Sequence, residues 1–150
     1  MRVGEICTRV PVTCTRETSL TEVAGMMREQ HVGAVIVVDR DADARPRPVG
    51  VVTDRDLVVE IMAKGVDPLT FLAGDLLMGS LHLVNECDSI YDAVWQMRGH
   101  GVRRLPVVDD GGALVGVLTS DDVTRVLGEA LSDIARTVPN QIRQERQLRP

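Results

Sequence analysis

A chain of 150 residues can bury roughly 70% of its unfolded surface, so it needs neither disulfides nor a metal to fold. Its net charge of −5 and aromatic content of 2% disfavour nucleic-acid binding, which depends on basic faces and aromatic stacking. The apolar runs are too short to cross a bilayer or to form a signal peptide, and the three cysteines lack metal-type spacing. These features predict a cytoplasmic protein with reduced cysteines and with no nucleic-acid or membrane partner.

The second half of the chain repeats the first. A shift of 70 residues places residues 4–6 (GEI) over residues 74–76 (GDL). After a four-residue difference in one loop, a shift of 66 places residues 49–53 (VGVVT) over residues 115–119 (VGVLT). Similarity over so many positions indicates the duplication of one structural unit. We therefore predict a first repeat in residues 1–66, a second in residues 67–136 and a polar C-terminal tail in residues 137–150.

Both repeats show the same succession of local patterns, β-α-β-β-α. A short extended segment precedes a helix whose start is marked by Ser19 in one copy and Ser89 in the other. Two strands and a second helix complete each copy. The strands are joined by an Asp-Asp-Gly-Gly turn in the second repeat and by a longer charged loop over residues 40–48 in the first, which we expect to be solvated. The last helix is expected to end near Ile134, because Pro139 disfavours its continuation.

Residues 50–56 and 116–122 share the pattern Gly-apolar-apolar-Thr-x-x-Asp at a predicted strand-to-helix junction. Free backbone N–H groups and the helix dipole favour an anion there. The Thr hydroxyl can donate to a phosphate oxygen, and the Asp carboxylate can accept hydrogen bonds from the two hydroxyls of a ribose. The pattern is also close to a capping box, which would start the helix with no ligand present. The spacing alone favours this second interpretation.

The repeat as a whole resembles the cystathionine-β-synthase (CBS) domain. The resemblance rests on residues 50–56, residues 116–122 and residues 101–109 (GVRRLPVVD), and it covers roughly residues 3–134. A tandem pair of this kind looks like a Bateman module, which implies an α+β fold with the two β-α-β-β-α repeats packed as a pseudo-two-fold pair. It also implies an adenosine-containing ligand, such as AMP, ADP, ATP, S-adenosylmethionine or an NAD-type molecule, bound in clefts between the repeats.

The resemblance assigns roles to individual residues. Thr53 and Thr119 would hold phosphate, and Asp56 and Asp122 would hold the ribose. Backbone near the first strand of each repeat would line the base, around Val12, Thr13, His82 and Leu83.

The two copies differ at one pair of positions. Arg103 and Arg104 lie where the family often places phosphate-binding residues, although a solvated strand end is an equal alternative. The first copy has Gly33 and Ala34 there, which carry no charge. Whether both clefts bind, and whether they bind the same ligand, is therefore left open.

The function predicted from these features is a regulatory, adenosyl-nucleotide-binding sensor without catalysis, which needs no cofactor or metal and acts on an unidentified regulated protein. The alternative, from a different class, is a ligand-free scaffold of the same fold that acts through dimerisation. An enzyme is not expected, because the sequence offers no nucleophile, base or metal constellation, and the three histidines lack a second ligand at helical spacing.

We also expect a homodimer. Tyr91 and Trp95 form a second apolar stripe on the predicted helix over residues 90–98, outside the stripe that serves its own core. The first repeat has Thr21 and Gly25 at these positions, so the fold does not require aromatic residues there. Exposed Trp and Tyr are enriched at interfaces. The alternative is that Trp95 packs over another helix of its own repeat.

Overall fold

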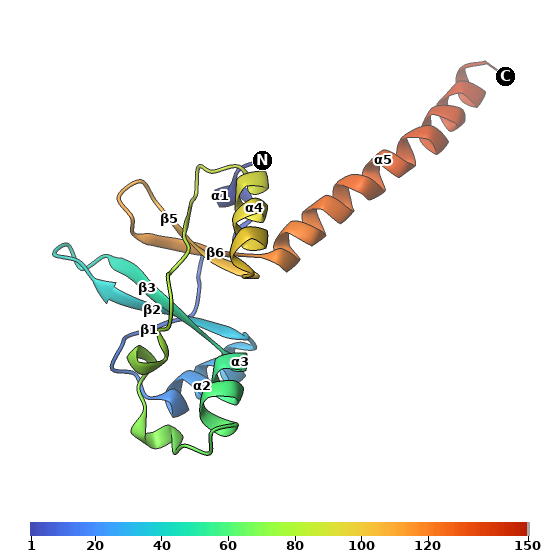
Figure 1. The fold of residues 1–150 in the computed structure, drawn as a ribbon. Helices are drawn as coiled ribbons and strands as arrows, with labels where there is room; N and C mark the ends of the chain where they lie inside the picture. Colours follow the sequence, from blue (N-terminus) through green and yellow to red (C-terminus); the bar gives the residue numbers. More distant parts are fainter. Residues whose placement is uncertain (150) are drawn as a thin grey trace.

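The computed structural model describes residues 1–149, which form two three-stranded sheets flanked by helices (Figure 1). Each sheet has the order of its sequence, β1-β2-β3 and β4-β5-β6. In each, a two-residue first strand runs parallel to the second strand, and the second and third strands form an antiparallel hairpin. The α+β fold of two related repeats, predicted from the sequence, is confirmed. No helix within residues 1–149 has the length and apolarity that crossing a membrane would require.

The first repeat contains a helix that covers one face of its sheet. Ser19 caps this helix, α2, by accepting a hydrogen bond from the Glu22 N–H, while the Glu22 carboxylate accepts one from the Ser19 N–H. Helical spacing places Leu20, Val23 and Met27 on one buried face of α2. The elements of this repeat are β1 (Thr13–Cys14), α2 (Leu20–Gln30), β2 (Ala34–Arg40), β3 (Pro46–Thr53), α3 (Asp54–Asp56), the π-helix η1 (Leu57–Met62) and two 3₁₀ turns, η2 (Pro68–Thr70) and η3 (Ala73–Leu76).

The second repeat has the same plan. Ile90, Ala93 and Met97 form the buried face of its first helix, at the positions equivalent to those of the first repeat. Its core is entirely aliphatic and includes Leu105 and Leu118, both fully buried. Its elements are β4 (Val84–Asn85), α4 (Ile90–His100), β5 (Arg104–Val108), β6 (Leu114–Thr119) and the long helix α5 (Ser120–Leu148).

The opening segment of each sequence repeat packs on the other repeat. Helix α1 (Val3–Ile6) lies in the core of the second repeat, where the Gly4 N–H donates to the Glu86 carbonyl at 2.9 Å. The equivalent turn η3 lies in the core of the first repeat, where the Gly74 N–H donates to the Arg16 carbonyl at 2.9 Å. The two repeats are therefore interlocked, because each contributes one short segment, α1 or η3, to the core of the other.

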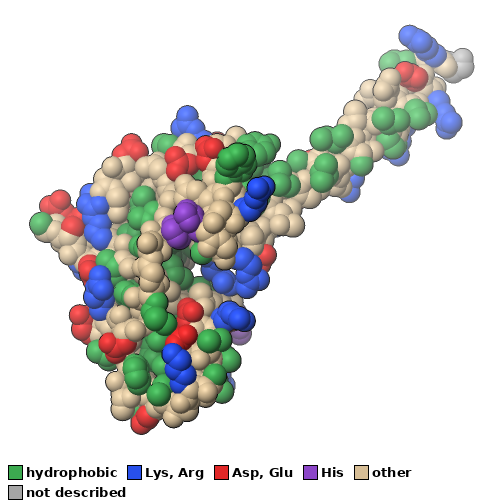
Figure 2. Space-filling view, viewed as in Figure 1, with side chains coloured by type: hydrophobic (Ala, Val, Ile, Leu, Met, Phe, Trp, Pro, Cys, Tyr) green, Lys and Arg blue, Asp and Glu red, His purple; other side chains and the backbone are tan. Residues whose placement is uncertain are grey.

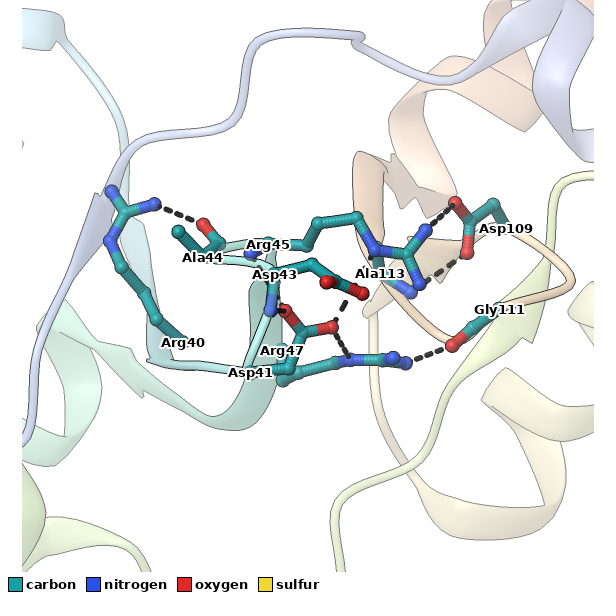
Figure 3. Close-up of polar contacts among 9 residues, drawn as sticks. All are labelled: Arg40, Asp41, Asp43, Ala44, Arg45, Arg47, Asp109, Gly111 and Ala113. Carbon is teal, nitrogen blue, oxygen red and sulfur yellow. Dashed lines mark hydrogen bonds and ion pairs between the residues drawn. The ribbon is translucent and has the colours of Figure 1, made fainter.

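The two sheets pack against each other through a small apolar cluster formed mainly by Ile36, Val38 and Leu114. Beside it, the loop over residues 40–48 folds around Asp41, which accepts hydrogen bonds from the N–H groups of Asp43 and Arg45 (Figure 3). Arg45 then reaches Asp109 in the turn of the other hairpin at 3.3 Å. The loop is solvated at its tip, where residues 42–44 are exposed as expected, but Arg45 and Arg47 are partly buried because they bond to Asp109 and to the Gly111 carbonyl of the second repeat.

Helix α5 continues far beyond the point expected from the sequence. It runs for 29 residues, with Pro139 inside it, and projects away from the body of the molecule (Figure 1). The prediction that the helix ends near Ile134 is wrong. Pro139 removes one backbone hydrogen bond of the helix, and water can replace it because this part of α5 is exposed. Residues 137–149 include no glycine or further proline that would end the helix.

Candidate functional site

Two clefts lie between the repeats, and each is lined by residues from both. The larger, cleft 1, has a volume of about 390 Å³. It places the Thr-x-x-Asp junction of the first repeat opposite His82 and Arg103–Arg104 of the second. Its remaining wall is the chain segment that leads from η3 to β4. The polar residues of cleft 1 are Thr53, Asp54, Arg55, Asp56, Glu60, Ser80, His82, Arg103 and Arg104.

Cleft 2 is the pseudo-symmetric counterpart, with a volume of about 260 Å³. It places Thr119 of the second repeat opposite Val12 and the segment 31–34 of the first repeat. Its lining is mostly apolar, and its one arginine, Arg104, reaches it from the wall that it shares with cleft 1. The two clefts thus use equivalent backbone but different side chains.

The Thr-x-x-Asp residues form the same hydrogen-bonded box at both junctions. The Thr53 N–H and hydroxyl donate to Asp56 Oδ2 at 2.8 and 2.7 Å, and the Asp56 N–H donates back to Thr53 Oγ1 at 3.2 Å. Thr119 and Asp122 repeat this pattern at 2.9, 2.6 and 3.1 Å. Each pair therefore starts its helix as a capping box, which the sequence offered as the alternative to a ligand site.

The backbone donors at the start of α3 also have partners. The Asp54 N–H donates to the Gly33 carbonyl, and the Arg55 N–H donates to Asp54 Oδ1. The free N–H groups expected from the sequence at this junction are therefore satisfied within the chain. The donors that cleft 1 offers to an anion are therefore side-chain groups around the junction.

The glycine of each motif makes room for a crossing segment. A Cβ atom at Gly50 would overlap the Leu77 side chain. At Gly116 it would lie 2.8 Å from the Thr8 carbonyl oxygen and 2.9 Å from Cys7 Sγ. In the second repeat the crossing segment pairs with the strand, since Thr8 and Val117 exchange backbone hydrogen bonds at 2.9 Å. Burial raises the pKa of the neighbouring Cys7 thiol, which keeps it protonated at neutral pH.

Cleft 1 is lined by three arginines, Arg55, Arg103 and Arg104, which balance the charge of its three carboxylates. The ion pairs within residues 1–149 involve other basic residues, so these three guanidinium groups are not neutralised by a carboxylate within 4 Å. Arg104 packs beside Gly33, where a Cβ atom would lie 3.1 Å from Nη2. A guanidinium group without a carboxylate partner is a strong donor for phosphate.

Two histidines stack at the side of cleft 1. The rings of His82 and His100 lie 3.5 Å apart at an angle of 12°. This face-to-face arrangement gives no chelating pair, and within residues 1–149 no three His, Cys, Asp or Glu side chains gather as metal ligands. His82 nevertheless brings an aromatic surface to the edge of the cleft.

The structure brings most of the residues singled out from the sequence to the clefts. Thr53, Asp56, His82, Arg103 and Arg104 line cleft 1, while Val12 and Thr119 line cleft 2. Thr13, Leu83 and Asp122 lie near these walls without lining either cleft. The sequence analysis missed Asp54, Arg55, Glu60 and the segment 76–81. The first two are inside the recognised motif, so their proximity could have been inferred from it.

Comparison with known proteins agrees with this architecture. The sequence model of the CBS domain matches residues 3–63 and 73–129. Hypoxic response protein 1 of Mycobacterium tuberculosis is 40% identical over 119 residues, which cover 79% of this chain and 80% of that protein. An uncharacterised protein of Methanopyrus kandleri is 35% identical over 124 residues, which are 83% of this chain but only 61% of the archaeal protein.

Solved structures show the same fold. A CBS domain protein from Pyrobaculum aerophilum, complexed with AMP, is 33% identical with a TM-score of 0.72, over 81% of this chain and 89% of that one. A crystal structure of hypoxic response protein I, with two coordinated zinc ions, is 33% identical with a TM-score of 0.70, over 83% of this chain and 98% of that one. The chain belongs to the CBS-domain family and consists of a tandem pair of these domains.

Proposed function

We propose that the protein is a regulatory module that binds an adenosyl nucleotide in cleft 1 and performs no catalysis. The ligand class is AMP, ADP, ATP or S-adenosylmethionine. The observation that carries the proposal is the convergence, in one cleft of about 390 Å³, of Thr53 and Asp56 with three unpaired arginines. A ribose acceptor beside guanidinium donors for phosphate fits a nucleotide better than it fits a neutral metabolite.

Binding requires a small change in the capping box. A hydroxyl group has one proton, and that of Thr53 is donated to Asp56 Oδ2. To hold a phosphate oxygen it rotates, while the Thr53 N–H keeps its own bond to the same carboxylate oxygen. Asp56 Oδ1 is then available to the ribose hydroxyls. The helix start therefore survives binding, and one charge-assisted hydrogen bond, to the carboxylate, is exchanged for another, to the phosphate.

Cleft 2 is proposed to bind this ligand more weakly. It keeps the Thr119–Asp122 box but has Gly33 and Ala34 where cleft 1 has two arginines. A polyphosphate would find one guanidinium group there instead of three. We therefore expect one tight site for each chain, in cleft 1.

The relatives support the ligand class. The Pyrobaculum protein, which is 33% identical over most of the chain, was solved as a complex with AMP. We propose that the present chain shares this kind of ligand, that it acts in the cytoplasm, and that binding is passed to a regulated protein that remains to be identified.

The experiment that tests the proposal is native mass spectrometry of the purified protein followed by calorimetric titration with AMP, ADP, ATP and S-adenosylmethionine. One nucleotide bound per chain, with a dissociation constant in the micromolar range or tighter, is the expected result. Absence of binding for all four ligands would favour the alternative, a ligand-free scaffold of the same fold that acts by dimerisation.

We further propose that the protein is a homodimer with Trp95 at its interface. Trp95 is 77% exposed and Tyr91 69% exposed, so neither packs over a helix of its own repeat within the described chain. Large exposed aromatic side chains on one helix face are typical anchors of an interface. Trp95 is the single tryptophan, so dilution should red-shift its emission as the dimer dissociates, and Trp95→Ala should weaken self-association in sedimentation.

A further inference from the structure

Most of helix α5 has no contact with the body of the molecule. Every residue from 127 to 149 is exposed, and the helix projects into solvent (Figures 1 and 2). Its apolar side chains nevertheless recur every three or four residues, which places them on one face. This stripe consists of Leu127, Leu131, Ile134, Val138 and Ile142.

An isolated helix of this composition is marginal in water. Most of the stability of protein helices comes from packing an apolar face, and the exposed part of α5 also contains Gly128 and Pro139, the two residue types that disfavour helix most. Small residues flank the stripe, including Gly128, Ala130 and Ala135, and they allow another helix to approach closely. The stripe is therefore suited to packing against a second helix.

The charge of α5 indicates which partner. Its first half, residues 120–133, has four carboxylates against one arginine, a net charge of −3. Its second half, residues 134–149, has four arginines against one glutamate, a net charge of +3. A second copy of α5 is complementary to the first when the two helices run in opposite directions, and it is repelled when they run in parallel. Antiparallel helix dipoles act in the same sense.

We propose that α5 pairs with α5 of a second copy as an antiparallel helix pair centred between Ile134 and Ala135. In this register Leu127 of one copy faces Ile142 of the other, and Leu131 faces Val138. The helix of 29 residues is about 44 Å long, so the two bodies lie at opposite ends of the pair without colliding.

This pairing rests on the self-association of the proposed function, but it uses a different contact. Helix α4, which carries Trp95, packs on the start of α5, where Val123 shares a buried cluster with Ala93 and Met97 (Figure 1). In an antiparallel pair the end of the partner's helix returns toward that start, so one dimer can contain both contacts. Nucleotide binding in cleft 1 does not depend on either of them.

The first test is sedimentation equilibrium of the full chain with Ile134→Asp and its matched control, Ser132→Asp, which adds the same charge on the opposite face of α5. Neither residue touches the body, so folding of the body is preserved. We expect a dimer for the unmodified protein and the control, and a dissociation constant at least tenfold higher for Ile134→Asp. A monomer in all three, or a dimer that Ile134→Asp leaves unchanged, would overturn the pairing.

The second test determines orientation by disulfide cross-linking in a Cys87→Ser background, which removes the exposed native thiol. An antiparallel pair predicts that Leu127→Cys chains cross-link with Ile142→Cys chains when the two are mixed. It also predicts that Leu127→Cys chains alone do not cross-link, because 15 residues of helix, about 22 Å, separate their thiols. Cross-linking of Leu127→Cys chains alone would establish a parallel pair and refute the proposal. A dimer that Trp95→Ala leaves unchanged, with cross-linking retained, would instead refute only the contact at Trp95.

Discussion

The two clefts have the same backbone frame but differ in what surrounds it. At both junctions a threonine and an aspartate three residues later form the same box, with hydroxyl-to-carboxylate distances of 2.7 and 2.6 Å. Around the first box the other repeat contributes Arg103 and Arg104, and the first repeat adds Arg55. Around the second box Gly33 and Ala34 replace the arginine pair and Asp121 replaces Arg55. The crossing segment there is hydrogen-bonded to the strand through Thr8.

This comparison separates two roles that the motif combines. A box that is identical in both repeats serves the helix start in both, whether or not a ligand binds. In the proposed function, binding depends on the side chains that the opposite repeat brings to the box. Duplication allows such a division, because one copy can retain a fold-stabilising motif while the cleft around it changes.

The largest expected effect comes from removing the arginines that distinguish the clefts. The double variant Arg103→Ala/Arg104→Ala should weaken binding of ADP at least about 100-fold, because each charge-assisted hydrogen bond contributes about 1.5–3 kcal/mol. Titration calorimetry measures the change. Arg28→Ala/Arg98→Ala is the matched control, since both residues are exposed helix arginines outside the clefts. A change below threefold in the first double variant would show that cleft 1 is not the phosphate site.

The second prediction compares the two boxes directly with Asp56→Ala and Asp122→Ala. Each variant loses the same cap, which should lower the free energy of unfolding by about 1 kcal/mol and the Tm by roughly 2–4 °C. The unmodified protein should gain roughly 5–10 °C with ADP at a hundred times its dissociation constant. Asp122→Ala should keep this gain and Asp56→Ala should lose it.

Thermal unfolding of the two variants with and without ADP measures both effects. An equal ligand-induced gain in both variants would contradict the assignment of the ribose to cleft 1. Loss of the ligand-induced gain in both variants would indicate that ADP binding depends on both clefts.

Much of the fold could be predicted from the sequence because the duplication marks it twice. The helix starts at Ser19 and Ser89 and the two Thr-x-x-Asp junctions follow from local capping chemistry. The exchange of α1 and η3 between the repeats could not be predicted. Gly4 and Gly74 have the same local sequence context, and nothing within a few residues specifies which sheet such a short segment joins.

The candidate site was predicted in part for the same reason. The motif identified Thr53 and Asp56, and the difference between Arg103–Arg104 and Gly33–Ala34 indicated that the clefts are unequal. The wall over residues 76–81 carries no motif, and it belongs to cleft 1 only because Leu77 crosses the strand at Gly50. Such a contact depends on tertiary packing, which local patterns do not encode.

A third prediction tests the ribose contact at cleft 1 with a change in the ligand. Replacing AMP by 2′-deoxy-AMP should weaken binding roughly ten- to a hundredfold, because the lost hydrogen bond to the Asp56 carboxylate contributes about 1.5–3 kcal/mol. Asp122→Ala should show the same discrimination between the two ligands. Equal affinities for AMP and 2′-deoxy-AMP in calorimetry would rule out a carboxylate contact with the 2′-hydroxyl.

The smallest expected effect concerns the hairpin turn of the first repeat, which is four residues longer than that of the second. Asp41 organises the longer turn, and hydrogen bonds from the backbone N–H of Arg45 and from the Arg47 side chain hold its pKa below the usual range (Figure 3). A carboxyl group whose pKa is lower in the folded state stabilises the protein above its unfolded pKa of about 3.9. This contribution disappears as the pH falls through the folded pKa. The Tm of the unmodified protein should therefore exceed that of Asp41→Asn at pH 6, and the difference should shrink below about pH 4.

Asp43→Asn is the control, because only the backbone of Asp43 bonds to Asp41. A difference between Asp41→Asn and the unmodified protein that stays constant from pH 6 to pH 2.5 would mean that the charge of Asp41 does not hold this turn against the second repeat.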